Sequence, residues 1–250
     1  MQRRILMAAG ATLAAPGLAR AQGTTLRVLA GSGIAPALQE IAAAHERASG
    51  HRLDMMFAPT PQLVAEATSG RAFDLGVVPS ELFRDAAARA AFEATEPARI
   101  AHVGYGVAVR AGAPKPDIST GERLRQALLA APAVSTLPGS AAGAHVMSVF
   151  ERLGIAAEMR AKLVVATTPP GIPAAVAEGR ASLALFLTNV LAAPGVELAG
   201  PFPPEFQQDL VYLGARAARG GQAEAAAALL RHLRGPEAQA VLRGKGLTPG

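Results

Sequence analysis

The sequence predicts an α/β fold with two lobes, each built on a mixed, mostly parallel sheet, with a hinge and a central cleft between them. Three observations support this fold: apolar strands alternate with amphipathic helices, short glycine- or proline-containing turns join strand to helix, and two segments can cross between the lobes. Strands that alternate with helices in this way usually pair in parallel. With 250 residues, the chain is long enough for one large domain or two lobes.

The first lobe begins with one arrangement used twice, in which an apolar strand runs directly into a short turn and a helix starts there. The first copy has a strand at Leu26–Ala30, the turn Gly31-Ser32-Gly33 and a helix at Ala35–Ser49. The second has a strand at Leu53–Phe57, the turn Ala58-Pro59-Thr60-Pro61 and a helix at Gln62–Ser69. Helix N-termini offer unpaired N–H groups and partial positive charge. Two of them at the ends of neighbouring parallel strands predict a site for an anion or small ligand.

Apolar runs bounded by glycine and proline predict the remaining elements. We expect strands at Asp74–Val78, Val103–Arg110, Val134–Leu137, Lys162–Ala166, Ser182–Leu187 and Leu210–Ala215. We expect helices at Glu81–Ala91, Arg123–Ala130, Ala144–Leu153, Ile172–Glu178, Gln222–Arg234 and Pro236–Gly244. The segment Gly195–Pro204 is rich in glycine and proline, so a connecting loop is predicted there. The strand–turn–helix arrangement recurs at Ser140–Gly143 and Thr167–Gly171.

Both lobes are predicted to be assembled around two crossing segments, near residues 103–110 and 205–215. Residues 22–103 and 216–250 are assigned to the first lobe. Residues 104–215, including the strands that cross the hinge, are assigned to the second. Each lobe then points two helix N-termini into the shared cleft.

Residues 1–21 have the features of a secretory signal peptide. Arg3 and Arg4 make the start of the chain positive, an apolar run follows over residues 5–18, and Ala19-Arg20-Ala21 fits a cleavage site. A transmembrane anchor is the alternative, but the apolar run is short and contains a glycine and a proline. We therefore expect export to the periplasm, and the arginine pair at residues 3–4 permits the twin-arginine route.

The composition argues against several classes of function. The chain has no cysteine, so it has neither disulfides nor the lipidated cysteine of an exported lipoprotein. Three of the 24 basic residues lie in the predicted signal peptide, which leaves 21 against 19 acidic residues. The remaining basic residues form no dense patch, so nucleic-acid binding is not expected. No histidine cluster has metal-ligand spacing, and we expect neither a metal nor a cofactor.

The hydroxyl residues of the predicted turns admit two interpretations. Ser32 and Thr60 can contact a ligand or cap their helices, and the two roles can coexist. Ser140 can belong to an anion-binding turn, whereas the spacing around it differs from the G-x-S-x-G of a nucleophile elbow. No catalytic residue is therefore assigned.

Other polar and aromatic residues have mostly structural interpretations. His145 lies in the first turn of a helix that should face the cleft, so it is a candidate for ligand proximity. His45 and His51 lie near a helix end, where solvated roles are usual. Tyr105 and Tyr212 are expected to pack at the hinge, and Asp74 is expected to order the turn before its strand.

Four blocks carry a resemblance to a known family, namely Leu26–Ala44, Phe57–Val78, Gly139–Ile155 and Ala175–Leu187. In these blocks and their spacing, the chain resembles the periplasmic molybdate-binding proteins of ABC transporters, within the type II solute-binding fold. The likeness covers nearly the whole mature chain. It implies a monomer whose two lobes close on a small oxyanion such as molybdate or tungstate and then dock on an ABC permease.

The resemblance also implies that neutral donors hold the anion: hydroxyls, backbone N–H groups and one tyrosine hydroxyl. Carried over by position, the implied ligand-binding residues are Ser32, Gly33, Thr60, Ser140, Ala141, Ala142, Gly143, Gly171, Leu187 and Thr188. This chain departs from the family pattern at several of them. The first-turn serine of the family aligns with Gly33, and its tyrosine falls at or beside Leu187, which has no hydroxyl.

The fourth turn departs from the pattern as well, because Pro169 and Pro170 have no N–H to donate. Thr188 or Asn189 could replace the missing tyrosine donor. A hydrogen bond to a charged group contributes about 1.5–3 kcal/mol, so the loss of two would weaken oxyanion binding by several orders of magnitude. Either other residues substitute or the ligand differs.

The leading functional hypothesis is thus a periplasmic solute-binding protein that delivers a small oxyanion to an ABC importer by hinge closure. The first alternative is an exported binding protein of the same fold for a small organic anion, which the missing tyrosine and the two prolines favour. An exported hydrolase lacks support because no triad or metal-ligand spacing is present. A transcription-factor effector domain is disfavoured by the export signal and by the absence of a DNA-binding segment.

Overall fold

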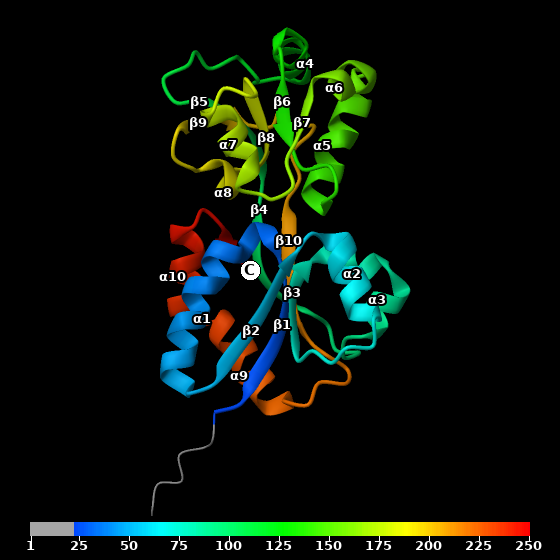
Figure 1. Ribbon diagram of the computed structural model, residues 1–250, viewed down its shortest axis with the longest axis vertical. Helices are drawn as coiled ribbons and strands as arrows, with labels where there is room; N and C mark the ends of the chain where they lie inside the picture. The colour runs from blue at the N-terminus through cyan, green and yellow to red at the C-terminus, as the bar shows by residue number, and fades with distance from the viewer. Residues whose placement is uncertain (1–22) are drawn as a thin grey trace, which may run out of the picture.

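The computed structural model describes residues 23–250, and the predicted signal peptide lies outside them. Two lobes are stacked along the long axis of the molecule, one around a six-stranded sheet and one around a five-stranded sheet (Figure 1). The predicted two-lobed α/β fold with mixed sheets and a hinge is confirmed. Within the described residues, no helix combines the length and the apolar character needed to cross a membrane.

The six-stranded sheet of the first lobe has the order β11-β4-β10-β3-β1-β2. Its strands are β1 (Thr25–Gly31), β2 (Arg52–Ala58), β3 (Leu75–Pro79), β4 (Ala98–Val103), β10 (Leu210–Arg216) and β11 (Thr248–Pro249). The five-stranded sheet of the second lobe has the order β7-β6-β8-β5-β9. Its strands are β5 (Tyr105–Arg110), β6 (Val134–Thr136), β7 (Leu163–Val165), β8 (Leu183–Leu187) and β9 (Val196–Pro201).

Parallel pairing is restricted to the strands that are followed by helices at the cleft. In the first lobe β1 pairs in parallel with β2 and β3, and in the second β6 pairs in parallel with β7 and β8. The other five pairings among the described strands are antiparallel and involve β4, β5, β9, β10 and β11. Parallel pairing is therefore less dominant than the alternation of strands and helices predicts.

Helices cover both faces of the first sheet, as the alternation of side chains along β1 requires. Leu26 and Val28 face a core shared with Leu38 and Leu229, whereas Leu29 belongs to the core on the other face. The helices on the first face are α1 (Ala35–Ser49), α9 (Ala223–Leu233) and α10 (Pro236–Gly244). Those on the second are α2 (Thr60–Thr68) and α3 (Ala86–Ala90) (Figure 1).

The second lobe contains five helices among the described residues. They are α4 (Gly121–Ala130), α5 (Ala141–Arg152), α6 (Ala156–Lys162), α7 (Gly171–Ala177) and α8 (Thr188–Leu191). Two 3₁₀ helices of the first lobe, η1 (Ser32–Ile34) and η2 (Ser80–Arg84), follow β1 and β3. The short helices α6 and α8 and the two-residue strand β11 were not predicted from the sequence.

Three predictions of secondary structure need correction. The strand expected over 103–110 is β5, whereas β4 before it was not predicted, and the chain passes from the first sheet to the second at Gly104. The predicted loop 195–204 contains β9, which tolerates its glycine and proline because it is the edge strand beside β5. The helix expected over 81–91 is divided by Asp85, whose side chain accepts a hydrogen bond from the N–H of Ala88 at 2.8 Å and so starts α3.

Strand β10 belongs to the sheet of the first lobe, which bears on the predicted boundary between the lobes. Its residues 210–216 pair with β3 and β4 of the first sheet, whereas residues 104–215 were assigned to the second lobe. The sheet pairing therefore supports a boundary before Leu210, which we propose in place of residue 215.

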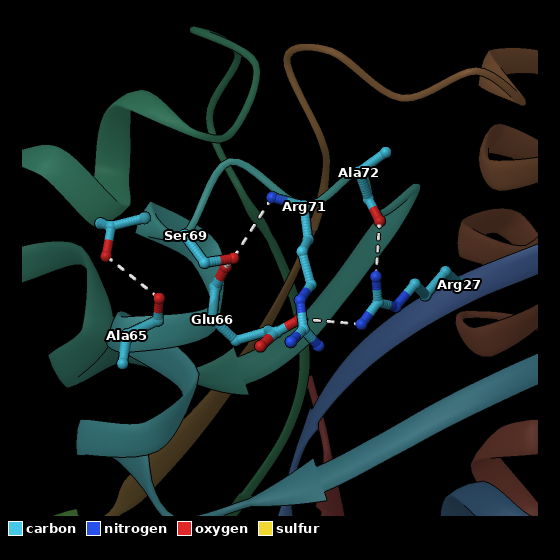
Figure 2. A network of polar contacts seen from close by, with 7 residues as sticks. Arg27, Ala65, Glu66, Ser69, Arg71 and Ala72 are labelled. Atoms are coloured by element: carbon cyan, nitrogen blue, oxygen red, sulfur yellow. Dashed lines mark hydrogen bonds and ion pairs between the residues drawn. The ribbon is translucent and has the colours of Figure 1, made fainter.

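A polar network holds α2 and the following turn against β1. The Arg27 guanidinium donates to the Glu66 carboxylate at 2.8 Å and to the carbonyl of Ala72 at 3.2 Å, and Arg71 approaches the same carboxylate (Figure 2). The N–H of Arg27 donates to the Asp74 carboxylate at 2.9 Å, so Asp74 orders this turn as expected. These contacts fix the C-terminal end of α2, and with it the direction in which its N-terminal turn points.

His45 is buried, contrary to the solvated role expected for it. Only 5% of its surface is exposed, because its ring packs against that of His232 in α9 with centroids 5.0 Å apart. The ring of His51 is stacked with that of His45, with centroids 6.4 Å apart. Burial lowers the pKa of His45, and the neighbouring His232 and His51 lower it further, against a smaller opposing effect of Glu46.

This cluster predicts that acid destabilises the protein. Below the ordinary histidine pKa of 6.5, the unfolded chain binds a proton at His45 that the folded chain resists, so the free energy of unfolding falls as the pH falls. Urea unfolding followed by circular dichroism should therefore give a lower stability at pH 5 than at pH 7. The His45→Leu variant should show a smaller difference, with the remainder coming from His145, whose pKa burial also lowers. An equal pH dependence in both proteins would contradict the assignment.

Candidate functional site

A pocket of about 270 Å³, which includes space open to solvent, lies between the two lobes where the ends of several strands meet. The carboxyl ends of β1, β2 and β3 reach it from the first lobe, and the end of β8 and the first turn of α5 reach it from the second. Its lining residues are Gly31, Ser32, Gly33, Ala58, Pro59, Thr60, Pro79, Ser140, Ala141, Ala142, Phe186, Leu187, Leu210 and Tyr212. No charged side chain is among them.

Ser32 and Thr60 line the pocket, and neither side chain caps a helix. The cap positions belong to Gly31 and Pro59, and neither helix start has a side-chain cap. Among the described residues, neither hydroxyl has a hydrogen-bond partner, so both remain available to a ligand. Helix capping is therefore not the role of these two hydroxyls, and ligand contact remains as a proposal.

Ser140 has a different role, because its hydroxyl is already engaged. It accepts a hydrogen bond from the N–H of Gly143 at 3.0 Å and donates to the carbonyl of Leu137 at 2.9 Å. The serine thus caps α5 and turns its first residues toward the pocket. Ala141 and Ala142 line the pocket, and N–H groups in the first turn of a helix have no acceptor inside the helix.

Three of the residues implied by the resemblance lie outside the pocket lining. Gly143 packs against the backbone of Leu137, where a Cβ would overlap the carbonyl oxygen. Gly171 donates its N–H to the carbonyl of Thr168 at 3.1 Å, so that group is already satisfied. The methyl group of Thr188 faces Gly106 in β5. Leu187 does line the pocket and gives it an apolar wall.

Among the lining residues that the sequence did not predict, Tyr212 is the one that carries a hydroxyl. It lies on β10, directly opposite Pro79 at the end of β3, and only 1% of its surface is exposed. Gly31 and Gly33 make room for it: a Cβ at Gly31 would lie 2.8 Å from the Tyr212 ring, and one at Gly33 would overlap its hydroxyl. Burial raises the pKa of Tyr212 above its ordinary value of 10, so the hydroxyl stays protonated.

A direct contact joins the lobes at the edge of this pocket. The side-chain amide of Asn189, in α8, donates a hydrogen bond to the carbonyl of Gly33 at 2.9 Å. A Cβ at Gly33 would lie 3.1 Å from Leu187, so the turn after β1 is in close contact with the end of β8. The structure therefore shows the lobes in contact over the cleft.

His145 does not reach the pocket lining, although it was a candidate for ligand proximity. Its ring packs on Tyr105 with centroids 4.4 Å apart, and its Nε2 lies 2.8 Å from the carbonyl oxygen of Phe206. Burial lowers the pKa of His145, and the contact with Phe206 opposes this. Within residues 23–250, no group of three or more histidine, aspartate or glutamate side chains is arranged to hold a metal ion.

Known proteins of this fold bind several kinds of anion. The periplasmic molybdate-binding protein of Azotobacter vinelandii is 16% identical, with a TM-score of 0.72 over 90% of this chain and 99% of its own. PEB3 of Campylobacter jejuni, solved with L-phospholactate bound, is 12% identical, with a TM-score of 0.67 over 90% of this chain and 100% of its own. These likenesses show the fold alone.

Two further comparisons match nearly the whole sequence of this chain. An aconitate isomerase from a Pseudomonas species is 32% identical, over 97% of this chain and 95% of its own length. A family model described as bacterial extracellular solute-binding protein matches residues 26–248. Together with the two lobes and the pocket between them, these matches show that the chain belongs to the bacterial extracellular solute-binding protein family.

Proposed function

We propose that this protein is a periplasmic solute-binding protein that captures a small organic carboxylate between its lobes. The observation that carries the proposal is the composition of the pocket. Unengaged hydroxyl groups come from the first lobe, N–H groups in the first turn of α5 come from the second, and the remaining walls are apolar. On one side of such a pocket, neutral donors can bind a carboxylate group. On the other side, apolar side chains can contact a short carbon skeleton.

A tetrahedral oxyanion such as molybdate or tungstate is the competing ligand. It presents oxygen atoms in every direction and therefore needs donors on all sides. Here Leu187 and Leu210 form apolar parts of the wall, and the N–H of Gly171 is engaged elsewhere. The L-phospholactate bound to PEB3 supports the view that this fold can accommodate organic anions.

Isomerisation of a carboxylate is a second candidate function, favoured by the 32% identical aconitate isomerase. Proton transfer within a substrate requires a general base such as histidine, a carboxylate or lysine. None of these lines the pocket, and burial keeps the Tyr212 hydroxyl protonated. Aconitate is therefore a natural ligand to test, whereas binding without turnover is the function that the pocket supports better.

Hinge closure and delivery to an ABC permease complete the proposal. The crossing segments at β4–β5 and β9–β10 provide the hinge, and the Asn189–Gly33 hydrogen bond joins the lobes in the closed arrangement. We propose a monomer exported by its signal peptide, with no cofactor.

A ligand panel tests the proposal. Residues 22–250 are heated with cis-aconitate, trans-aconitate, citrate, succinate, lactate, molybdate, tungstate or sulfate. A ligand at about 1,000 times its Kd adds roughly 4 kcal/mol to stability, which raises Tm by about 10 °C for a protein of this size. We expect such a shift with a carboxylate and not with molybdate or tungstate.

The opposite selectivity would contradict the carboxylate and favour oxyanion uptake. NMR of the recovered ligand distinguishes binding from catalysis: cis-aconitate should be recovered unchanged. Its protein-dependent conversion to the trans isomer would establish an isomerase instead.

The free hydroxyls predict a second result. Ser32→Ala and Thr60→Ala should each weaken binding of the carboxylate about 10-fold or more, because each removes a donor to a charged group. Ser49→Ala and Thr68→Ala are matched controls at the opposite ends of α1 and α2, where the hydroxyls bond helix carbonyls. Calorimetry should show parental affinity in both controls. Equal affinities in all four variants would contradict the assigned contacts.

The Asn189–Gly33 contact between the lobes predicts a third result. Asn189→Ala removes one neutral hydrogen bond, which contributes about 0.5–1.5 kcal/mol, so Kd should rise about 2- to 10-fold. Small-angle X-ray scattering of the ligand-free variant should show a larger radius of gyration than the parent, because fewer molecules are closed. Unchanged affinity together with an unchanged radius would show that this contact does not contribute to closure.

A further inference from the structure

The hydroxyl of Tyr212 is a polar group in the pocket that the fold itself does not use. The side chain is almost fully buried, yet the residue lines the pocket. Among the described residues, no donor or acceptor forms a hydrogen bond with this hydroxyl. The Tyr105 hydroxyl is fully enclosed without a partner, whereas the Tyr212 hydroxyl is not fully enclosed and reaches the pocket, where a ligand can accept its hydrogen bond.

The position of this hydroxyl is determined by two glycines. Gly31 leaves space for the ring, and Gly33 leaves space for the oxygen, so the hydroxyl occupies the volume that a side chain of residue 33 would fill. That volume lies beside Ser32, whose own hydroxyl is free at the same pocket. Tyr212 and Ser32 therefore offer two donors on the first-lobe side.

The electrostatics allow this hydroxyl to donate and not to accept a proton. Burial, with smaller contributions from Tyr105 and Glu81, raises the pKa of Tyr212 above its ordinary value of 10. A protonated phenol next to an uncharged pocket suits an anionic acceptor. Apolar Leu187 and Leu210 line the same pocket, so the acceptor group is expected to be carried on a small carbon skeleton.

We propose that the Tyr212 hydroxyl is the specificity-determining donor of this pocket, and that it hydrogen-bonds a carboxylate oxygen of the bound organic anion. This inference rests on the proposed function and names the group that recognises the ligand. Tyr212 binds the ligand directly and takes no part in a covalent step.

The only other tyrosine of the chain supplies a matched control. Tyr105 is also fully buried, and its hydroxyl has no hydrogen-bond partner, but it does not line the pocket. Tyr212→Phe and Tyr105→Phe therefore make the same chemical change, removing the hydroxyl of a buried tyrosine, once inside the pocket lining and once outside it. Neither is expected to lower the free energy of unfolding.

Calorimetry with the carboxylate that gives the largest Tm shift in the panel, starting with cis- and trans-aconitate, tests the inference. Tyr212→Phe should raise Kd about 10- to 100-fold, as expected for the loss of a hydrogen bond to a charged group, and Tyr105→Phe should stay within about 2-fold of the parent. Parental affinity in Tyr212→Phe would overturn the inference and leave the proposed function intact. Failure of every probe to bind the parent would overturn both.

Tyrosine fluorescence gives a second readout that does not depend on the Tyr212 variant. The chain has two tyrosines and no tryptophan, so all tyrosine emission of Tyr105→Phe comes from Tyr212. A hydrogen bond from the phenol to a carboxylate quenches this emission, and saturating ligand should lower it. Unchanged emission, at ligand concentrations where calorimetry shows saturation, would overturn the inference.

Discussion

The parallel pairing of β1 with β2 and β3 is the constraint on which the site depends. In register, Gly31 at the end of β1 lies beside Ala58 at the end of β2, and β3 ends nearby at Pro79. Parallel strands bring their carboxyl ends to the same edge of the sheet, so the helices that follow β1 and β2 start side by side. The second lobe repeats this arrangement with β6 and β8. A pocket lined by helix N-termini is a consequence of strand direction.

In the proposed function, the pocket binds an anion although no residue that lines it carries a charge. The Arg27–Glu66 pair, which holds α2 against β1, lies outside the pocket lining (Figure 2). Hydroxyl and N–H dipoles stabilise a carboxylate strongly only where water is excluded, because a high dielectric weakens their electrostatic interaction with the charge. In the proposed function, contact between the lobes therefore contributes to binding as well as to enclosure, and Gly33 takes part in both because it lines the pocket and accepts a hydrogen bond from Asn189.

Local signals in the sequence predicted the elements around the pocket well. The helix at Ala35–Ser49 is observed with the predicted ends, because proline in its first turn and Gly50 after its last turn mark them. The edge strand β9 was missed because its glycine and proline indicate a loop, and its partner β5 is distant in sequence. Tyr212 was assigned to hinge packing because β10 reaches the pocket only through antiparallel pairing with β3, from far along the chain. The glycines on both sides of Ser32 are the signal that was available, but they indicate a tight turn equally well. His45 was expected in solvent because α9, which buries it, returns from the C-terminal part of the chain.

A crystal structure of residues 22–250 with the carboxylate that raises Tm most tests the central claim most directly. We expect one carboxylate group to lie between the lobes, with its oxygens about 2.7–3.2 Å from donors of the first lobe and from N–H groups in the first turn of α5. Ser32 and Tyr212 are the first-lobe donors expected in that contact, and Leu187 should lie against the carbon skeleton. A ligand that contacts only one lobe, or that lies outside this pocket, would contradict recognition by neutral donors from both lobes.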